Sequence, residues 1–189
     1  MLLAFVCIGF GVASYRTSAN AIEKRVNESL PQIAEDAGKL INARLGIYFV
    51  GIDTAANRLV IRSMDWSKQL PALKEEMARQ GFMEMGVATP DGKTRYTDGT
   101  TAELGDRDYF KNALAGKVAM SDVVISRVTG KPVIMMAAPI TVDGRAVGVL
   151  LARLDGQLLS EISDNVKFGD IGYSYIINGK GALIAHRKR

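Results

Sequence analysis

The chain has 189 residues, of which 48% are hydrophobic, and its net charge at pH 7 is +4. This length is enough to bury one sizeable core and to begin a second. The charge excess is modest, and no basic stripe with interleaved aromatic residues is present, so the composition argues against a nucleic-acid partner. Cys7 is the only cysteine, which excludes an intrachain disulfide and a cysteine-based metal cluster.

The first apolar run, residues 2–15, contains no charged side chain and ends at Tyr15 and Arg16. We expect residues 1–15 to form a retained but incomplete transmembrane helix, because a spanning helix needs about 20 residues. The basic residues that normally precede the apolar region of a signal peptide are missing. A short buried helix and a signal peptide cut near residues 12–14 are the alternatives.

A long helix is predicted over residues 16–64, because apolar residues recur at spacings of three and four between charged positions. The recurring residues are Ile22, Val26, Leu30, Ile33, Ala37, Leu40 and Ile41. Pro31 removes one backbone donor, which predicts a kink or a break there, with Ser29 as a new cap. The apolar stripe suits either a homodimer seam or packing on the chain's own domain. Residues 45–61 are more apolar, which indicates burial against a sheet.

A second helix is predicted to begin at Asp65 and to end at Gly81. Its apolar face would consist of Leu70, Leu73, Met77 and Ala78. Trp66, at its start, is interpreted as a core anchor rather than a ligand contact. Residues 82–88 and 94–97 are predicted strands joined by a tight turn, and a polar loop follows from Asp98.

The stretch from residue 107 to residue 140 combines a short helix with two strands. The helix has its apolar face at Tyr109, Phe110, Ala113 and Leu114, and Gly116 stops it. The strands are residues 123–128 and 133–138, joined by turn residues 129–132. With a further strand over residues 146–154, the pattern predicts a five-stranded antiparallel sheet with helices on one face.

Leu158, Leu159 and Ile162 mark a short closing helix. After a linker at residues 169–172, two more strands are predicted at residues 173–178 and 182–186. Two strands alone cannot bury a core, so this hairpin is either an addition to the sheet edge or the start of another domain. We favour the start of another domain.

This order of elements resembles the double Cache (dCache_1) sensor region of bacterial methyl-accepting chemotaxis proteins and related transmembrane receptors. The most specific strings are Arg107-Asp108-Tyr109-Phe110, Ser121-Asp122, Thr129-Gly130-Lys131-Pro132, Ala138-Pro139, and Gly172-Tyr173 with Asn178-Gly179 to Ala185-His186. The resemblance implies an α+β fold with a long N-terminal helix and a PAS-like sheet. It places a membrane-distal ligand-binding module at residues 65–165 and a truncated membrane-proximal module at residues 166–189, so the chain looks like an N-terminal fragment.

The function that the resemblance implies is extracytoplasmic small-molecule sensing, as the input region of a transmembrane chemoreceptor. Residues 16–189 would lie outside the cytoplasm, with the N-terminal helix in the inner membrane. Two alternatives remain open. The same sensor module serves histidine kinases and diguanylate cyclases, and a membrane-tethered adaptor would use its sheet to bind a protein.

The resemblance also implies candidate ligand-binding residues. In the amino-acid-binding branch of the family, an arginine at the start of the helix over the pocket meets the ligand's carboxylate, followed by two aromatic residues. Here these places are taken by Arg107, Tyr109 and Phe110. Where the branch has a tyrosine and two aspartates, this chain has Val124, Ser126 and Arg153. An α-amino acid bound in the usual way is therefore disfavoured, although it stays an option.

Asp155 lies two positions after Arg153 on a predicted strand, so both side chains point to one face. Asp155 would either receive the ligand's amine or pair with Arg153. In the second case Arg107 is the only uncompensated charge, which favours a carboxylate or another small anion. As alternatives, Arg107 forms only a local ion pair with Asp106 or Asp108, and Tyr109 belongs to the core, as does the neighbouring Phe110. Tyr96 and Met135 are further candidates for the pocket wall.

Enzyme activity is not expected. The single histidine, His186, lies near the end of the chain and has no nucleophile beside it in the sequence. No cluster of His and Cys indicates a metal site, and no cofactor motif is present.

Overall fold

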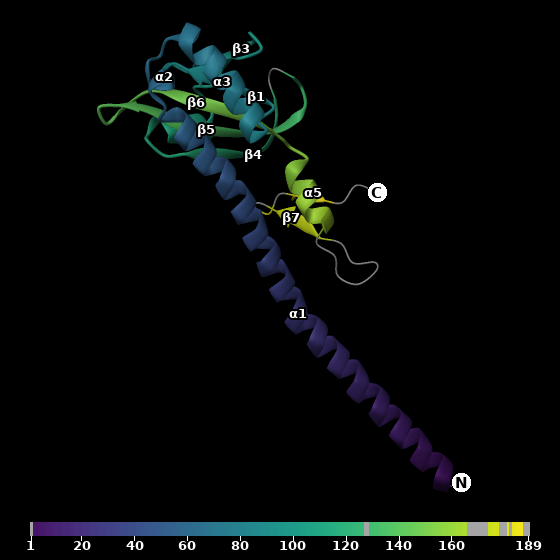
Figure 1. Cartoon of the computed structure of the whole chain (residues 1–189). Coiled ribbons are helices and arrows are strands. Elements are labelled where there is room, and N and C mark those ends of the chain that lie inside the picture. Colours follow the sequence, from purple (N-terminus) through teal and green to yellow (C-terminus); the bar gives the residue numbers. More distant parts are fainter. Residues whose placement is uncertain (1, 127–128, 166–173, 178–180, 182, 187–189) are drawn as a thin grey trace.

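The computed structural model describes residues 2–126, 129–165, 174–177, 181 and 183–186 (Figure 1). The helices are α1 (Leu2–Ala56), α2 (Leu59–Arg62), α3 (Trp66–Gln80), α4 (Asp108–Leu114) and α5 (Leu158–Asn165). The strands are β1 (Glu84–Ala88), β2 (Lys93–Tyr96), β3 (Thr101–Glu103), β4 (Ala119–Ile125), β5 (Pro132–Val142), β6 (Arg145–Asp155), β7 (Tyr175–Ile177) and β8 (Leu183–His186).

The main sheet has six strands in the order β3-β2-β1-β6-β5-β4, and all neighbours are antiparallel. The predicted α+β fold with a long helix and an antiparallel sheet is confirmed. The sixth strand, β3, lies in the segment predicted as a polar loop. It has only three residues and pairs with β2, Arg95 opposite Thr101, so it is too short to show an alternating pattern.

The longest strands, β5 and β6, are joined by a two-residue turn at Asp143 and Gly144. Both residues have positive φ angles, 49° and 75°, as a type I′ hairpin turn requires. This turn brings ten register pairs of β5 and β6 together at the centre of the sheet, where nearly every side chain is buried.

Helices cover both faces of the sheet, which differs from the predicted one-sided cover. On one face the C-terminal part of α1 and α3 pack on alternate residues of β1, β5 and β6 to form the larger core cluster. On the other face α4 packs on the remaining residues of the same strands to form a second cluster. The period of two in a strand sends neighbouring side chains to opposite faces, which explains the division.

Helix α1 is continuous over 55 residues and passes through Pro31, so the predicted break with a new cap at Ser29 does not form. Its C-terminal part is buried at Leu45, Ile52 and Ala55, as predicted for residues 45–61. The rest projects away from the sheet (Figure 1). No helix in the part of the chain that the structure describes combines the length and hydrophobicity that crossing a bilayer requires.

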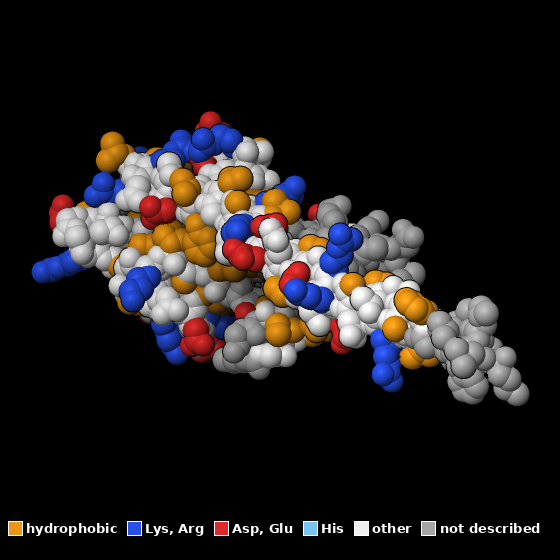
Figure 2. Space-filling view, turned by 90° about the horizontal axis from the view of Figure 1, so that it is seen from below, with side chains coloured by type: hydrophobic (Ala, Val, Ile, Leu, Met, Phe, Trp, Pro, Cys, Tyr) orange, Lys and Arg blue, Asp and Glu red, His pale blue; other side chains and the backbone are white. Residues whose placement is uncertain are grey.

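The projecting part of α1 exposes large apolar side chains between charged ones, and Figure 2 shows this mixture along the helix. The exposed apolar residues are Phe10, Val12, Tyr15, Ile22, Leu30, Leu40, Ile47 and Val50. An exposed apolar stripe of this kind is what a partner helix would cover. The homodimer seam remains a prediction.

Helix α3 has the predicted ends, with Asp65 as the N-cap accepting a hydrogen bond from the backbone of Ser67, and with Gly81 in the left-handed conformation at the C-cap. Its buried face differs from the predicted apolar one. The buried residues are Gln69, Ala72, Leu73 and Glu76. Two polar residues enter the core because both have partners, and Gln69 donates a 2.7 Å hydrogen bond to the Ile61 carbonyl.

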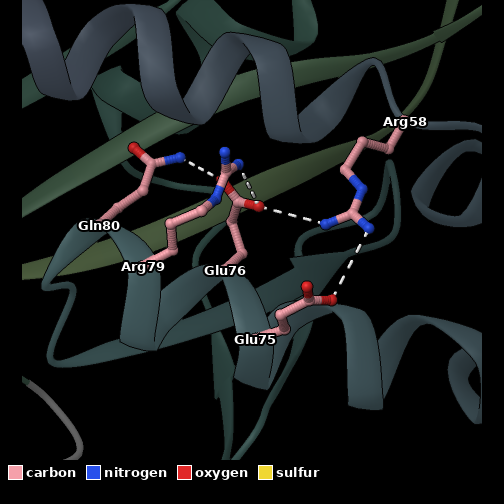
Figure 3. Close-up of polar contacts among 5 residues, drawn as sticks. All are labelled: Arg58, Glu75, Glu76, Arg79 and Gln80. Atoms are coloured by element: carbon pink, nitrogen blue, oxygen red, sulfur yellow. Dashed lines mark hydrogen bonds and ion pairs between the residues drawn. The ribbon is translucent and has the colours of Figure 1, made fainter.

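The Glu76 carboxylate ties α3 to the segment that follows α1 (Figure 3). Its side chain is 2% exposed and accepts hydrogen bonds from Arg58 at 3.2 Å, from Arg79 at 2.7 Å and from Gln80. Burial alone would raise the pKa of Glu76. The hydrogen bonds from Gln80 and Arg79 and the positive charges of Arg79 and Arg58 outweigh it, so the pKa lies below its ordinary value.

The C-terminal hairpin forms as predicted, with β7 and β8 paired in a separate two-stranded sheet. It is therefore not an addition to the edge of the six-stranded sheet. Figure 1 shows it beside α5, and Ser163 of α5 donates a 3.0 Å hydrogen bond to the carbonyl of Ser174. The predicted linker at residues 169–172 lies outside the described residues. The assignment of residues 166–189 to a second module stays a prediction.

Candidate functional site

A small cavity lies on the α4 side of the sheet, and most of the predicted ligand-binding residues line it. Its volume is about 20 Å³. The lining residues are Tyr96, Ala102, Leu104, Arg107, Tyr109, Val124, Ile125, Ser126, Met135 and Arg153. A space of this size holds about one water molecule. The structure thus brings Arg107, Tyr109, Ser126 and Arg153 together, with their side chains closed around the space between them.

The sheet register places the floor of this cavity. Met135 and Arg153 are directly opposite each other on β5 and β6, so their side chains share a face. Tyr96 lies opposite Gly86, and a Cβ on that glycine would sit 2.7 Å from Cδ1 of the Tyr96 ring. The glycine therefore leaves the room in which the ring lies over β1.

Arg153 is the most buried cation of the site, with 3% of its surface exposed. Its guanidinium lies over the Tyr96 ring, 4.8 Å from the centroid. The buried Nε atom has no hydrogen-bond partner. No carboxylate oxygen of the described residues lies within 4.0 Å of this guanidinium. The charge is therefore held by the Tyr96 ring and by more distant carboxylates such as that of Asp98, without a direct ion pair.

Asp155 does not line the cavity. It is exposed at the end of β6, where its carboxylate accepts a 2.8 Å hydrogen bond from the backbone of Gln157. The pairing of Asp155 with Arg153, one of the two predicted options, is not formed. The strand ends at this residue, and the turn that follows uses the carboxylate as a cap.

Arg107 is the backbone N-cap of α4, but its side chain makes no capping hydrogen bond. The Nε atom lies 4.0 Å from an oxygen of Asp106, at the limit of an ion pair, and has no hydrogen-bond partner. The side chain is 30% exposed. The alternative of a local ion pair with Asp106 is thus met only in its weakest form, and most of the donor capacity of Arg107 remains available.

Tyr109 and Phe110 are both buried, but they differ in position. Tyr109 lines the cavity. Phe110, 2% exposed, is not among the residues that line this cavity and packs in the core cluster under α4. Successive residues of a helix point about 100° apart, so only one of two adjacent aromatic residues faces the ligand side.

Ser126 follows β4 and is buried against the cavity. Its hydroxyl oxygen accepts a 3.1 Å hydrogen bond from the backbone of Thr129, which helps to form the turn before β5. Ser126 therefore has a structural role in addition to its predicted place in the pocket wall.

The hydroxyl of Tyr96 completes the polar lining. Burial raises the pKa of Tyr96, and the nearby positive charge of Arg153 opposes this rise without cancelling it. The phenol is therefore protonated at neutral pH and can donate a hydrogen bond to a ligand.

A second, larger hollow adjoins the cavity and shares Arg107, Tyr109 and Val124 with it. Its volume is about 390 Å³, which is within the range of small-molecule sites. The remaining lining residues are Asp106, Asp108, Asn112, Met120, Ser121 and Asp122. Sequence reasoning missed this acidic wall, although the alternation of Asp122 and Val124 along one strand would have placed both on the same side.

A third hollow, of about 750 Å³, lies elsewhere, between the start of α3 and the outer strands β2 and β3. It contains Trp66, which is half-buried, packs against the core and carries the Arg95 guanidinium 4.9 Å from the centroid of its ring. The predicted role of Trp66 as a core anchor is confirmed, with one ring face left to this hollow. None of the predicted ligand-binding residues and no buried unpartnered arginine lines it, so it is the weaker candidate.

A comparison with known families shows to which family this chain is related. The Cache domain model dCache_1 matches residues 18–189, nearly the whole chain. The chain belongs to the Cache domain family. This Cache domain also resembles solved structures. The ligand-binding domain of the Pseudomonas fluorescens chemoreceptor CtaA in complex with L-serine has a TM-score of 0.75 and 19% identity, over 87% of this chain and 73% of that one.

A second solved relative is the sensory domain of the Campylobacter jejuni chemoreceptor Tlp3 with isoleucine bound, with a TM-score of 0.68 and 14% identity, over 82% of this chain and 68% of that one. At these identities the likeness shows a common fold. The resemblance stated from the sequence strings is thereby confirmed at the level of family and architecture.

Proposed function

We propose that this Cache domain is an extracytoplasmic sensor of small molecules and the input region of a transmembrane chemoreceptor. The family match supports sensing, and the similar solved domains belong to chemoreceptors crystallised with serine or isoleucine. A histidine kinase or a diguanylate cyclase as the output partner is an equally compatible receptor type, because the sensor module would be the same.

The observation that carries this proposal is the position of Arg107 between the closed cavity and the adjoining hollow. A guanidinium with free donors at the start of a helix binds a carboxylate by two parallel hydrogen bonds. Tyr109 stands beside it as the wall of both spaces. The ligand class that fits is a carboxylate or another small anion, and an amino acid would need a mode of binding different from that of the amino-acid branch.

The membrane side of the proposal rests on α1. The helix would carry residues 1–15 into the inner membrane and hold residues 16–189 outside the cytoplasm, and its exposed apolar stripe would form a homodimer seam. The C-terminal hairpin would begin a membrane-proximal module. In this arrangement the chain binds a ligand without catalysing a reaction, and no cofactor takes part.

The first test is a ligand screen by thermal unfolding of the full chain in detergent, with carboxylates, amino acids, amines and purines as the panel. A ligand present at 100 times its dissociation constant stabilises the folded state by about 2.7 kcal/mol. We expect an anion to raise the melting temperature, and we expect Arg107→Ala to abolish that rise while leaving the unliganded melting temperature nearly unchanged.

Arg145→Ala is the matched control, because Arg145 is an exposed arginine at the start of β6 and lines none of the hollows described above. It should keep the full response to the anion. A panel without any response would contradict the sensor role and favour the protein-binding adaptor. Unfolding of the unliganded Arg107→Ala variant would instead assign a structural role to Arg107.

A further inference from the structure

We propose that the ligand of this site is a small dianion, such as a dicarboxylate, with one anionic group held by Arg107 and the other by Arg153. This inference rests on the proposed sensor function and assigns the ligand class of the same site. It adds a second charge contact, at the deep end of the cavity.

The first argument is the distribution of unpartnered buried donors. Among the described residues, three buried side-chain polar atoms lack a hydrogen-bond partner, the Nε atoms of Arg62, Arg107 and Arg153. Two of the three line the same cavity. Buried polar groups are nearly always hydrogen-bonded, so two orphans in one small space indicate a missing acceptor there.

The second argument is charge. A buried guanidinium costs free energy unless an opposite charge pairs with it, and here two guanidinium groups line one space. The Tyr96 ring compensates part of the Arg153 charge. Asp98 also lies near enough for the Arg153 charge to help lower the pKa of its carboxyl. Neither contact supplies the acceptor that the Nε atom lacks. An anion that reaches each arginine would neutralise both.

The geometry also separates a dianion from a zwitterion. At the Arg153 end no described carboxylate forms an ion pair with the guanidinium. Glu84, opposite Arg153 on β1, accepts a hydrogen bond from the Thr97 hydroxyl with its Oε1 atom. Asp155 accepts a hydrogen bond from the backbone of Gln157. The acidic residues of the site line the adjoining hollow, beyond Arg107. An amino acid would place its ammonium group most favourably among these carboxylates in the outer hollow, and Arg153 would then lack an anionic partner.

Neutral donors complete the recognition of the second anionic group. The side chains of Tyr96 and Ser126 both line the cavity, and the protonated Tyr96 phenol can donate a hydrogen bond. The cavity of about 20 Å³ must widen toward the adjoining hollow for a ligand to enter. Because both spaces share Arg107 and Tyr109, the outer anionic group would remain on Arg107 while the inner one reaches Arg153.

The experiment compares two ligands of nearly the same shape, succinate and its monoamide succinamate, by titration calorimetry on the full chain at pH 7.5. Malonate and glutarate extend the series in length, and L-serine and L-isoleucine represent zwitterions. We expect at least one dicarboxylate to bind about 10- to 100-fold more tightly than its monoamide, as a hydrogen-bonded charge contact provides. Arg153→Gln should remove this preference and leave the affinity for the monoamide within about 2-fold.

Arg145→Gln is the control and should change neither affinity. Equal affinity of dicarboxylate and monoamide for the unaltered chain would overturn the dianion proposal, and this comparison holds even where Arg153→Gln fails to fold. Tightest binding of an amino acid, insensitive to Arg153→Gln, would overturn it in favour of a zwitterion while leaving the sensor function intact. Failure of every acid and amino acid to bind would count against both proposals.

Discussion

Each face of the sheet has a buried charged side chain packed against it, and the two side chains differ in how far their hydrogen-bonding groups are satisfied. Glu76, on the face covered by α1 and α3, accepts hydrogen bonds from two arginines and a glutamine. Arg153, on the face covered by α4, has an aromatic ring beside it and an Nε atom without a partner. The first arrangement is complete in the folded chain alone. The second leaves a buried donor without a partner, and this is the reason for proposing that a ligand binds there.

The largest effect on stability is expected from Glu76→Ala. The substitution removes the acceptor of hydrogen bonds from three side chains, two of them charged. Arg58 and Arg79 keep 37% and 62% of their side-chain surface exposed and can return to water. We expect the free energy of unfolding to fall by about 2 kcal/mol, which lowers the melting temperature by about 4–8 °C.

Thermal unfolding followed by circular dichroism measures this effect, and Glu75→Ala is the neighbouring control. Glu75 is 73% exposed and meets Arg58 only at 3.9 Å, so its loss should have little effect. Equal melting temperatures of the two variants would show that the Glu76 cluster does not hold α3 in place.

A smaller effect of opposite sign is expected from Arg153→Met in the absence of ligand. Methionine keeps the length of the side chain and removes a buried charge that has no ion-pair partner among the described residues. We expect the free energy of unfolding to rise by about 1 kcal/mol, measured by urea titration. Arg153→Met should also lose the response to an anionic ligand.

A marked loss of stability in Arg153→Met would reverse the interpretation. It would mean that the contact with the Tyr96 ring, or the more distant charge of Asp98, is sufficient to make Arg153 structural. The contrast between the two faces would then disappear, because both buried charges would serve the fold.

The smallest effect concerns pH. The pKa of Glu76 in the folded chain lies below its ordinary value of 4.5. A carboxyl with a lowered pKa contributes stability that is fully present above the unfolded pKa and is lost as pH falls through the folded one. The difference in free energy of unfolding between the unaltered chain and Glu76→Gln should therefore be constant near neutral pH and shrink below about pH 4.5. Urea titrations across this range measure it, and a difference independent of pH would exclude an ionised Glu76.

The sequence predicted the ends of elements well where a local rule operates. Asp65 and Gly81 delimit α3 because capping is decided by a few neighbouring residues. It failed where packing decides. The buried face of α3 contains Gln69 and Glu76, because Ile61 and Arg58, outside the helix, satisfy these side chains. Helix α1 also passes through Pro31, which no described contact explains.

The candidate site shows the same division. The family resemblance predicts Arg107, Tyr109, Ser126 and Arg153 as ligand-binding residues, and the structure brings them around one cavity. The position of the Asp155 side chain depends on the residue at which β6 ends. The alternation of side chains along a strand does not give that residue. The acidic wall of the adjoining hollow was also missed, because it joins residues from α4 and β4 that only the folded chain brings together.

Gly86 helps to determine the shape of the site although it has no side chain. Because a Cβ there would lie 2.7 Å from the Tyr96 ring, any other residue would force the ring off β1 and away from the guanidinium that it covers. A related chain with alanine at this position would need another way to shelter the deep arginine, or would do without it. The residue at position 86 is therefore a marker that could separate related sensors that bind a ligand through two charged groups from those that use one.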